Sequence, residues 1–340
     1  MKLLVFTQKV DKNDPILGFF HTWIEKMAEK AESISVICLS KGEYSLPNNV
    51  TVYSLGKENK FGRIKYIINF YKYLHLINGS YDKVFVHMNQ EYVILGGIYW
   101  KLNGVPVYMW RNHKAGNALT NFAVMLSTKV FCTSEYSYTA KYKKTVIMPA
   151  GIDTNMFKPV EGVVRKKYSV GMIGRISPVK RLDLALSAIK ILVDSGRQVS
   201  LSLVGPVAEK DKAYSESLEE YVSKNGLSQI VHFGQGVSMD KLPEIYSSIE
   251  VCLNLTDAGS FDKTIVESAS CGAIPLVSNK SFEGKLPQSC ITEDDAKSVA
   301  ASIDKLLYAH EQIQIQDSLS LFVKNQSLDN LMNKLFSEIS

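Results

Sequence analysis

Cysteine is scarce in this sequence, and its spacing excludes two kinds of stabilising site. The five cysteines among 340 residues are Cys38, Cys132, Cys252, Cys271 and Cys290. Because their number is odd and no Cys-x-x-Cys pair occurs, neither a disulfide framework nor a zinc site is indicated. Such use of cysteine is typical of a reducing compartment, so we expect a cytoplasmic protein.

Long apolar runs are missing as well. No stretch of 18 or more apolar residues occurs, so no transmembrane helix is predicted. The apolar run after Lys2 is far shorter than the core of a signal peptide. A composition of 46% hydrophobic and 21% charged residues excludes wholesale disorder. A length of 340 residues predicts two domains, at about 100–200 residues each.

The excess of positive charge is small overall but unevenly distributed. The chain has 39 Lys+Arg and 34 Asp+Glu residues, and a net charge of +5 is too weak to indicate a nucleic-acid-binding protein. Residues 1–160 contain 20 basic and 11 acidic side chains, a net charge of +9, which leaves −4 for residues 161–340. This asymmetry predicts either an acidic partner for the first half or a solvated basic surface.

Basic and apolar side chains alternate over Lys57–His75. The basic residues are Lys57, Lys60, Arg63, Lys65 and Lys72, and the apolar ones are Phe61, Tyr66, Ile67, Phe70, Tyr71 and Leu74. This pattern suits peripheral contact with an anionic membrane, at the inner face of the cytoplasmic membrane. The alternative is an ordinary amphipathic helix with a basic outer face. No recognition motif supports nucleic acid, so we expect no such partner.

Short apolar runs alternate with stretches at helical spacing along the chain. The predicted strands are Lys2–Thr7, Ser33–Leu39, Val50–Ser54, Asp82–His87, Val105–Trp110, Lys129–Thr133, Thr145–Met148, Ser169–Ile173, Gln198–Val204, Ile230–Gly234, Glu250–Asn254 and Ile274–Val277. The predicted helices are Gly18–Lys30, Gly62–Leu76, Val93–Leu102, Ala118–Met125, Leu182–Ser195, Tyr214–Asn225, Lys241–Ser247 and one that opens at Ile265–Ser270. This alternation predicts an α/β fold of two doubly wound parallel sheets, with a domain boundary near 150–168 and a ligand cleft between the domains.

Two basic residues in the second half have the placement of a phosphate site. The segment Gly174–Arg181 follows a predicted strand and precedes a predicted helix. Arg175 and Lys180 are therefore expected at the carboxyl edge of a parallel sheet, where phosphates bind. A guanidinium fork and a compact ammonium group together suit a diphosphate. Charges on a solvated loop are the alternative.

A second candidate segment begins with small residues and enters a helix. Residues 259–264 lead into the predicted helix, whose N-terminus offers free backbone N–H groups to an anion. Glu267 lies one or two turns into this helix, where a carboxylate can accept both hydroxyls of a ribose. The alternative for Glu267 is an acidic residue that the helix dipole favours.

These segments, taken together, resemble the retaining glycosyltransferases of family 4. The resemblance also rests on Asp153 with Phe157-Lys158-Pro159, on Leu203-Val204-Gly205, on Phe233-Gly234 and on the run from Glu267 to Pro275. It covers nearly the whole chain, and the order of the motifs is more specific than any one of them. The resemblance implies the GT-B fold, two Rossmann-like domains that face a central cleft. It implies an acceptor-side domain over residues 1–160, a nucleotide-sugar-binding domain over 161–320 and a C-terminal helix over 321–340 that packs back on the first domain.

The resemblance also assigns roles to individual residues. In that family an arginine and a lysine clamp the donor diphosphate, which implies Arg175 and Lys180, and the second glutamate of a Glu-x7-Glu motif binds the ribose, which implies Glu267. The first glutamate falls at Gly259, a departure from the family, and Asp262 is the candidate replacement for its contact with the sugar. The donor-binding candidates are Gly18, Gly174, Gly205, Gly259, Ser260, Phe261, Asp262, Lys263 and Thr264.

Two histidines at the ends of predicted strands are candidates for the sugar or acceptor site. The family often has a histidine where His113 follows the strand Val105–Trp110, and we count His113 among the catalytic candidates. An imidazole there can hydrogen-bond the sugar or orient the acceptor. His87 and Asn89 are the second candidates for acceptor or sugar contact. For each histidine a purely structural role is the alternative.

The expected reaction follows from the resemblance. It is retaining transfer of a hexose-type sugar from a nucleotide diphosphate sugar, UDP in preference to GDP, to a hydroxyl of a glycan or lipid-linked acceptor in cell-envelope polysaccharide synthesis. No Asp-x-Asp motif stands in a suitable loop, and we expect no metal and no other cofactor, because the basic clamp and the helix N-terminus can hold the diphosphate. The alternatives are a non-catalytic nucleotide-sugar-binding protein, which Gly259 favours, and a nucleotide-sugar epimerase of the same fold.

Overall fold

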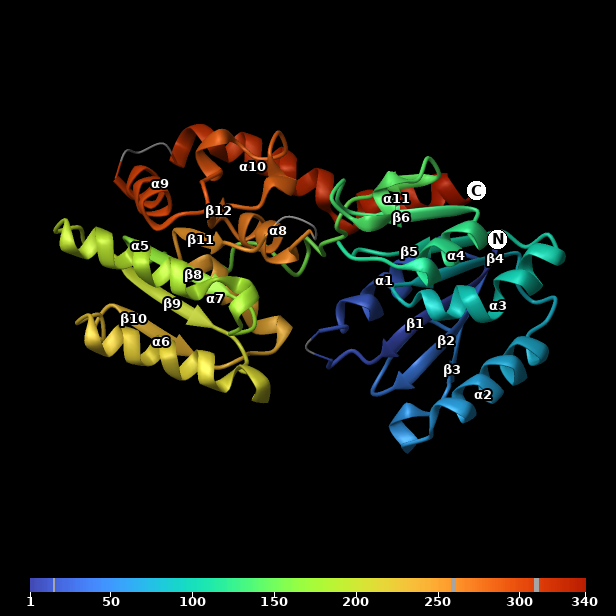
Figure 1. Cartoon of the computed structure of the whole chain (residues 1–340). Coiled ribbons are helices and arrows are strands. Elements are labelled where there is room, and N and C mark those ends of the chain that lie inside the picture. Colours follow the sequence, from blue (N-terminus) through green and yellow to red (C-terminus); the bar gives the residue numbers. More distant parts are fainter. Residues whose placement is uncertain (15, 258–260, 309–311) are drawn as a thin grey trace. The chain divides into compact units, whose positions relative to one another are not determined.

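The computed structural model describes residues 1–14, 16–257, 261–308 and 312–340 (Figure 1). The chain forms two compact units, whose described residues are 1–14, 16–151, 261 and 328–340 in the first and 152–257, 262–308 and 312–327 in the second. The contacts divide the chain after Gly151. Ile152 already belongs to the second unit, where its N–H donates to Gln326 O (3.1 Å).

The first unit contains a seven-stranded parallel sheet in the order β3-β2-β1-β4-β5-β6-β7. Its strands are β1 (Lys2–Val10), β2 (Ser33–Lys41), β3 (Val50–Ser54), β4 (Lys83–His87), β5 (Val107–Trp110), β6 (Lys129–Cys132) and β7 (Thr145–Ile147). In β1, Leu3 and Val5 face one hydrophobic cluster while Leu4 and Phe6 face another. Both faces of the sheet are therefore covered, which explains why its central strands are continuous apolar runs.

Different helices cover the two faces of this sheet. The helices of the first unit are α1 (Phe19–Ala28), α2 (Arg63–Leu76), α3 (Gln90–Leu102), α4 (Ala118–Leu126) and α11 (Leu328–Ile339). Helices α1 and α11 supply residues to the cluster around Leu3 and Val5. Helices α2, α3 and α4 supply residues to the cluster around Leu4 and Phe6. The latter three consequently form a continuous layer on one side of the sheet (Figure 1).

The C-terminal segment belongs to both units. The expected single helix over residues 321–340 is instead the end of α10 (Gln312–Gln326) followed by α11, with Ser327 between them. Helix α11 packs with α1, and Lys30 Nζ donates to Asn333 Oδ1 (3.0 Å). Its buried face, which includes Leu331 and Leu335, joins the core of the first unit.

The second unit contains a five-stranded parallel sheet in the order β10-β9-β8-β11-β12. Its strands are β8 (Ser169–Ile173), β9 (Ser200–Val204), β10 (Val231–Gly234), β11 (Val251–Asn254) and β12 (Ile274–Val277). Its helices are α5 (Leu182–Asp194), α6 (Lys212–Lys224), α7 (Leu242–Ser248), α8 (Lys263–Ser270), α9 (Ala296–Tyr308) and α10, with a short 3-10 helix η3 (Pro178–Lys180) before α5. The predicted α/β architecture of two parallel sheets is confirmed, and each predicted strand is present.

Two further expectations concern cysteine and hydropathy. All five cysteines are buried and free of disulfide bonds. Burial raises the pKa of the Cys38, Cys252, Cys271 and Cys290 thiols to about 12, so they behave as small apolar side chains. Within the described residues, no helix combines the length and the apolar character that crossing a membrane requires.

Candidate functional site

Two glycine loops meet at the carboxyl ends of β8 and β9. Gly174 follows β8 with φ of +140°, and its N–H donates to Val204 O (2.9 Å). Gly205 follows β9, and a Cβ at that position would lie 1.8 Å from the carbonyl oxygen of Gly174. Packing of the two loops therefore requires both of these candidate donor-binding glycines. Together they build the sheet edge that carries Arg175 and Lys180.

The two predicted clamp residues share this edge. Arg175 and Lys180 line one shallow depression together with Gly174 and Asn254. Arg175 is exposed, whereas the Lys180 side chain is only 19% exposed. The structure thus brings a guanidinium and an ammonium group to one rim of the second unit, as the strand-loop-helix pattern predicted.

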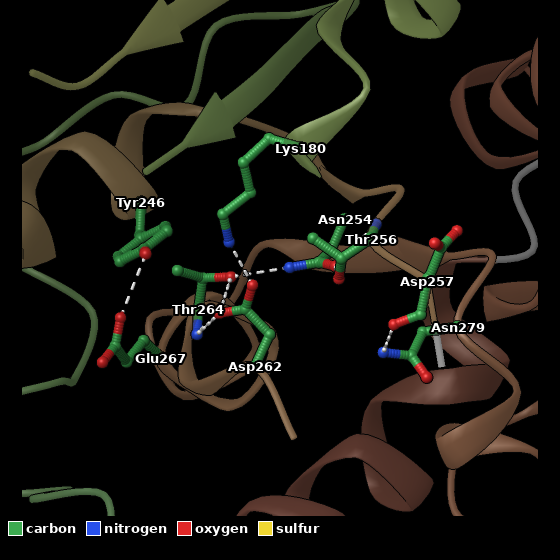
Figure 2. Close-up of polar contacts among 9 residues, drawn as sticks. All are labelled: Lys180, Tyr246, Asn254, Thr256, Asp257, Asp262, Thr264, Glu267 and Asn279. Carbon is green, nitrogen blue, oxygen red and sulfur yellow. Dashed lines mark hydrogen bonds and ion pairs between the residues drawn. The ribbon is translucent and has the colours of Figure 1, made fainter. Parts of the chain in front are cut away.

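Lys180 forms an ion pair with Asp262, which lies at the start of α8 (Figure 2). Asp262 Oδ1 also accepts from the N–H (3.3 Å) and the hydroxyl (3.0 Å) of Thr264, so that it caps the helix. Burial acts to raise the pKa of the Asp262 carboxyl, but the charge and hydrogen bond of Lys180 outweigh it, and the pKa is lowered. Asp262 is therefore ionised, caps the N-terminus of α8 and forms an ion pair with Lys180.

Buried polar residues fix the loop after β11. Asn254 Nδ2 donates to Thr264 Oγ1 (3.0 Å), and Asn254 Oδ1 accepts from the N–H of Thr256 (3.3 Å). Farther along the loop, Asn279 Nδ2 donates to the carbonyl oxygen of Asp257 (3.2 Å) (Figure 2). These contacts join the carboxyl end of β11 to the N-terminus of α8 and hold the Lys180 partner in place.

Glu267 lies inside the second unit on the buried face of α8. Its Oε2 accepts a hydrogen bond from the hydroxyl of Tyr246 (3.1 Å), a fully buried residue of α7 (Figure 2). Burial raises the pKa of the Glu267 carboxyl, and the charge of Lys263, four residues earlier, opposes that rise. Burial also lowers the pKa of the Lys263 ammonium group. Tyr246 therefore orients the Glu267 carboxylate, which is the predicted ribose-binding group. The charge of Lys263 limits the rise of its pKa.

The remaining donor-binding candidates lie around the start of α8. Phe261, Lys263 and Thr264 are each partly buried, and Thr264 is a hydrogen-bond partner of Asp262 and Asn254. Gly259 and Ser260 lie outside the described residues.

His87, at the end of β4, lies in an aromatic cluster. The side chain is 2% exposed, and its ring stacks on Phe20 with 3.9 Å between centroids and 9° between planes. The rings of Phe19 and Trp23 lie within 5.9 Å of it, and its Nδ1 is 3.3 Å from the hydroxyl of Thr7. This environment gives His87 a packing role in the first unit.

His113 and Asn89 differ from His87 in exposure. His113 is exposed, and its Nδ1 accepts from the N–H of Ala115 (3.0 Å). The same Nδ1 also lies 3.1 Å from the carbonyl oxygen of Ala115, so both polar groups of Ala115 hold this side of the ring. Asn89 is partly buried and precedes α3, next to Met88, which has φ of +68°. A left-handed conformation is unusual for methionine and marks the carboxyl end of β4 as strained.

Gly18 is fixed by its own loop. A Cβ at this position would lie 2.6 Å from the carbonyl oxygen of Asp14 and 3.0 Å from that of Lys12. Its N–H donates to Asp14 O (2.9 Å), and α1 begins at the next residue. The tight contacts within this loop therefore require glycine at position 18.

A cavity of about 520 Å³ lies beside the glycine edge in the second unit. Its lining residues are Ile176, Gly205, Pro206, Val207, Ser215, Glu219, Phe233, Gly234, Gln235 and Gly236. These come from the loops after β8, β9 and β10, from the end of β10 and from α6. The cavity and the Arg175–Lys180 rim thus adjoin the same carboxyl edge of the sheet.

Sequence reasoning missed Tyr246, Asn254 and Thr256. Asn254 ends a predicted strand at the carboxyl edge, and this position alone was a usable signal. Tyr246 gave no signal, because it meets Glu267 only through the packing of α7 on α8. Among the described residues, no group of three or more His, Cys, Asp and Glu side chains is arranged to hold a metal ion.

Sequence comparison relates the second unit to known transferases. Residues 153–313 match the family model "Glycosyl transferases group 1". The chain is similar to a D-inositol 3-phosphate glycosyltransferase of Streptomyces avermitilis, at 23% identity over 155 residues that cover 42% of this chain and 33% of the relative. It is also similar to an MMP alpha-(1->4)-mannosyltransferase of Mycolicibacterium hassiacum, at 26% identity over 178 residues that cover 49% and 41%. The chain thus spans about a third to two fifths of the length of these curated relatives.

Solved structures match the chain over its whole length. Anabaena Alr3699/HepE in complex with UDP superimposes with a TM-score of 0.80 and 16% identity, covering 100% of this chain and 99% of that one. WaaG, a glycosyltransferase involved in lipopolysaccharide biosynthesis, superimposes with a TM-score of 0.68 and 14% identity, covering 98% of each chain. The chain therefore has the GT-B fold, and its residues 153–313 are similar to the group 1 glycosyl transferases.

Proposed function

We propose that this protein is a retaining glycosyltransferase that moves a hexose-type sugar from a nucleotide diphosphate sugar to a hydroxyl of a glycan or lipid-linked acceptor. The observation that carries the proposal is the shared rim of Arg175 and Lys180 at the carboxyl edge of the second sheet. Glu267 is held in the same unit by Tyr246. Two cations and one oriented carboxylate fit the diphosphate and the ribose of such a donor.

In the proposed reaction, the bond between the anomeric carbon and the diphosphate oxygen breaks while the acceptor oxygen bonds to that carbon on the same face. The acceptor proton passes to the leaving diphosphate. Lys180 exchanges its contact with Asp262 for a diphosphate oxygen, and Arg175 adds a two-pronged contact. Both stabilise the charge that develops on the leaving group. His113 is the candidate for a hydrogen bond to a sugar or acceptor oxygen.

We assign UDP in preference to GDP as the donor nucleotide, and the cavity beside Gly205 to its base. The size of the cavity, about 520 Å³, and its place next to the diphosphate rim support this assignment. The similarity to Anabaena Alr3699/HepE, which has been solved in complex with UDP and with UDP-glucose, points in the same direction.

We place the acceptor with the basic first half of the chain, in cell-envelope polysaccharide synthesis on the cytoplasmic side of the membrane. The net charge of +9 over residues 1–160 suits an acidic or lipid-linked acceptor. Some relatives are named for phosphorylated acceptors or for lipopolysaccharide synthesis, which supports an acceptor of this class.

We propose further that catalysis needs no metal, because Arg175, Lys180 and the N-terminus of α8 supply positive charge where the diphosphate leaves. Exhaustive chelation with EDTA is expected to leave the transfer rate unchanged. A rate that falls on chelation and returns with Mg²⁺ or Mn²⁺ would assign that role to a metal.

The test begins with a thermal-shift screen of nucleoside diphosphates and their sugars, since a ligand of the folded protein raises its melting temperature. The best donor is then incubated with acceptor glycans, and released nucleotide and product are measured. Lys180→Ala is expected to lower kcat/KM on the order of a hundredfold or more. The matched control is Lys190→Ala, a surface lysine of α5 that pairs with Asp194.

The second candidate, a non-catalytic nucleotide-sugar-binding protein, is motivated by Gly259. It predicts donor binding that Lys180→Ala weakens, with no nucleotide release over any acceptor. An epimerase would release free nucleotide and an altered sugar without any acceptor. Turnover that requires an acceptor and keeps the anomeric configuration distinguishes the transferase from both.

A further inference from the structure

We propose that helices α2, α3 and α4 of the first unit form a docking surface for an anionic lipid bilayer. These helices cover one face of the sheet, and each carries large apolar side chains that are exposed. Exposed basic residues lie on α2 and just before it in the sequence. The surface is independent of the donor site and involves none of its residues.

Helix α2 is apolar on two opposite faces. Its inner face, with Phe70 and Leu74, is buried in the core. On its outer face Ile64, Ile68 and Tyr71, at positions i, i+4 and i+7, are 78%, 54% and 48% exposed. A helix on the surface of a water-soluble protein ordinarily carries polar side chains there. The apolar residues of the Lys57–His75 pattern therefore fall into two groups. Phe70 and Leu74 pack in the core, whereas Ile64 and Ile68 are exposed.

The charged residues of α2 have one sign. Arg63, Lys65 and Lys72 are exposed, and the helix contains no aspartate or glutamate. Lys57 and Lys60 precede it and are exposed as well. Such lysines can bury their methylene stems among lipid chains while the ammonium groups reach phosphate oxygens. An apolar stripe edged by lysines is the pattern of a helix that lies in the plane of a membrane interface.

Helices α3 and α4 extend the surface. The hydroxyl of Tyr71 donates to the carbonyl oxygen of Leu95 (3.0 Å), which joins α2 to α3. Helices α3 and α4 pack closely, because a Cβ at Gly97 would lie 2.9 Å from Leu126. The exposed apolar residues on these two helices are Ile98, Leu102, Leu119 and Met125.

The charge of the whole segment favours a bilayer over other partners. Residues 59–134, which include all three helices, contain nine Lys+Arg residues and two acidic ones, Asp82 and Glu91. A second copy of this chain would bring two faces of the same positive sign together, which costs free energy. Nucleic acid would contact the lysines but gain nothing from the exposed aliphatic side chains Ile64, Ile68, Ile98, Leu102, Leu119 and Met125 on the three helices. An anionic bilayer satisfies both the charge and the apolar residues.

The test is co-sedimentation of the full chain with sucrose-loaded vesicles. Vesicles of phosphatidylcholine with about one third phosphatidylglycerol are compared with phosphatidylcholine alone, at about 50 mM and about 500 mM salt. The protein is expected to pellet with the anionic vesicles and to be released by salt. Ile64→Asp/Ile68→Asp and Lys65→Glu/Lys72→Glu are each expected to lower the partition coefficient by on the order of tenfold or more.

Matched controls come from the second unit. Val164→Asp places the same charge at an equally exposed apolar position, and Lys166→Glu/Lys167→Glu reverses two exposed lysines. Both are expected to leave binding unchanged, and all variants should keep the wild-type melting temperature because the altered side chains are exposed. Absence of binding to anionic vesicles, equal binding to neutral ones, or equal loss in the controls would overturn the proposal. A dimer that Ile64→Asp/Ile68→Asp separates would assign the surface to self-association instead.

Discussion

Lys180 and Asp262 form an ion pair that ties the loop after β8 to the first turn of α8. The cation predicted to hold the donor diphosphate therefore has a carboxylate partner of its own. Asp262 cannot simply be removed, because it also caps α8 through Thr264. Any anion that engages Lys180 competes with this carboxylate, which makes Asp262 the residue that sets the strength of the diphosphate site.

Asp262→Asn is expected to tighten UDP binding on the order of tenfold. The asparagine keeps a capping oxygen for Thr264 and removes the negative charge that competes with the diphosphate. Isothermal titration calorimetry with UDP measures the change. Asp294→Asn is the control, since it removes the ion pair of the neighbouring Arg181 in the same unit. Equal or weaker UDP binding in Asp262→Asn would show that the carboxylate positions Lys180 instead of competing for it.

The placement of Arg175 and Lys180 could be read from the sequence, whereas their partners could not. Buried parallel strands are continuous apolar runs, so the end of β8 and the loop after it were evident from local pattern. The pairing of Lys180 with Asp262 joins residues 82 positions apart and depends on how β8 and β11 lie side by side.

The exact start of α8 and the burial of its side chains could not be predicted from the sequence either. It begins at Lys263, two residues before the expected start at Ile265, because Asp262 supplies the cap. Burial of Lys263 and Glu267 is a property of the packed unit and leaves no trace in local periodicity. Likewise, the pattern over Lys57–His75 could not distinguish the core face of α2 from an exposed apolar face.

The pKa of Glu267 predicts a pH-dependent affinity for the nucleotide. Burial raises this pKa, and only the ionised carboxylate can accept from both ribose hydroxyls. The ratio of UDP affinities between wild type and Glu267→Gln is therefore expected to rise as the pH increases from about 5 to about 8, by on the order of tenfold. Titration of the diphosphate itself affects both proteins and cancels in the ratio.

The contribution of Glu267 to the stability of the fold should decrease with rising pH, whereas its contribution to UDP affinity should increase. A carboxyl whose pKa is raised in the folded state favours folding at low pH, and this contribution is lost as the pH rises through the folded-state pKa. The melting temperature of wild type relative to Glu267→Gln is expected to fall over the same interval. Glu244→Gln, at an exposed position of α7, is the control and should show neither trend. A pH-independent affinity ratio would remove Glu267 from the ribose site.

Gly205→Ala tests the contact that builds the sheet edge. The added Cβ would lie 1.8 Å from the carbonyl oxygen of Gly174, so one of the two loops must move. We expect a loss of about 2 kcal/mol in the free energy of unfolding, measured by urea denaturation, and weaker UDP binding. Gly62→Ala is the control, because a Cβ there meets no atom within 4 Å and φ is −86°. Unchanged stability in Gly205→Ala would contradict the close approach of the loops.

The two candidate histidines should separate into one that supports the fold and one that supports the reaction. His87→Ala removes a buried ring stacked on Phe20, and we expect it to cost about 2–4 kcal/mol in the free energy of unfolding. His113→Ala removes an exposed ring, and we expect an unchanged melting temperature, unchanged UDP binding and a kcat/KM lower by on the order of a hundredfold. His232→Ala, an exposed position on β10, is the control for both measurements. If His113→Ala retains full activity, the imidazole has no role in transfer. If His87→Ala keeps wild-type stability but loses activity, the ring lies at the sugar and not only in the aromatic cluster.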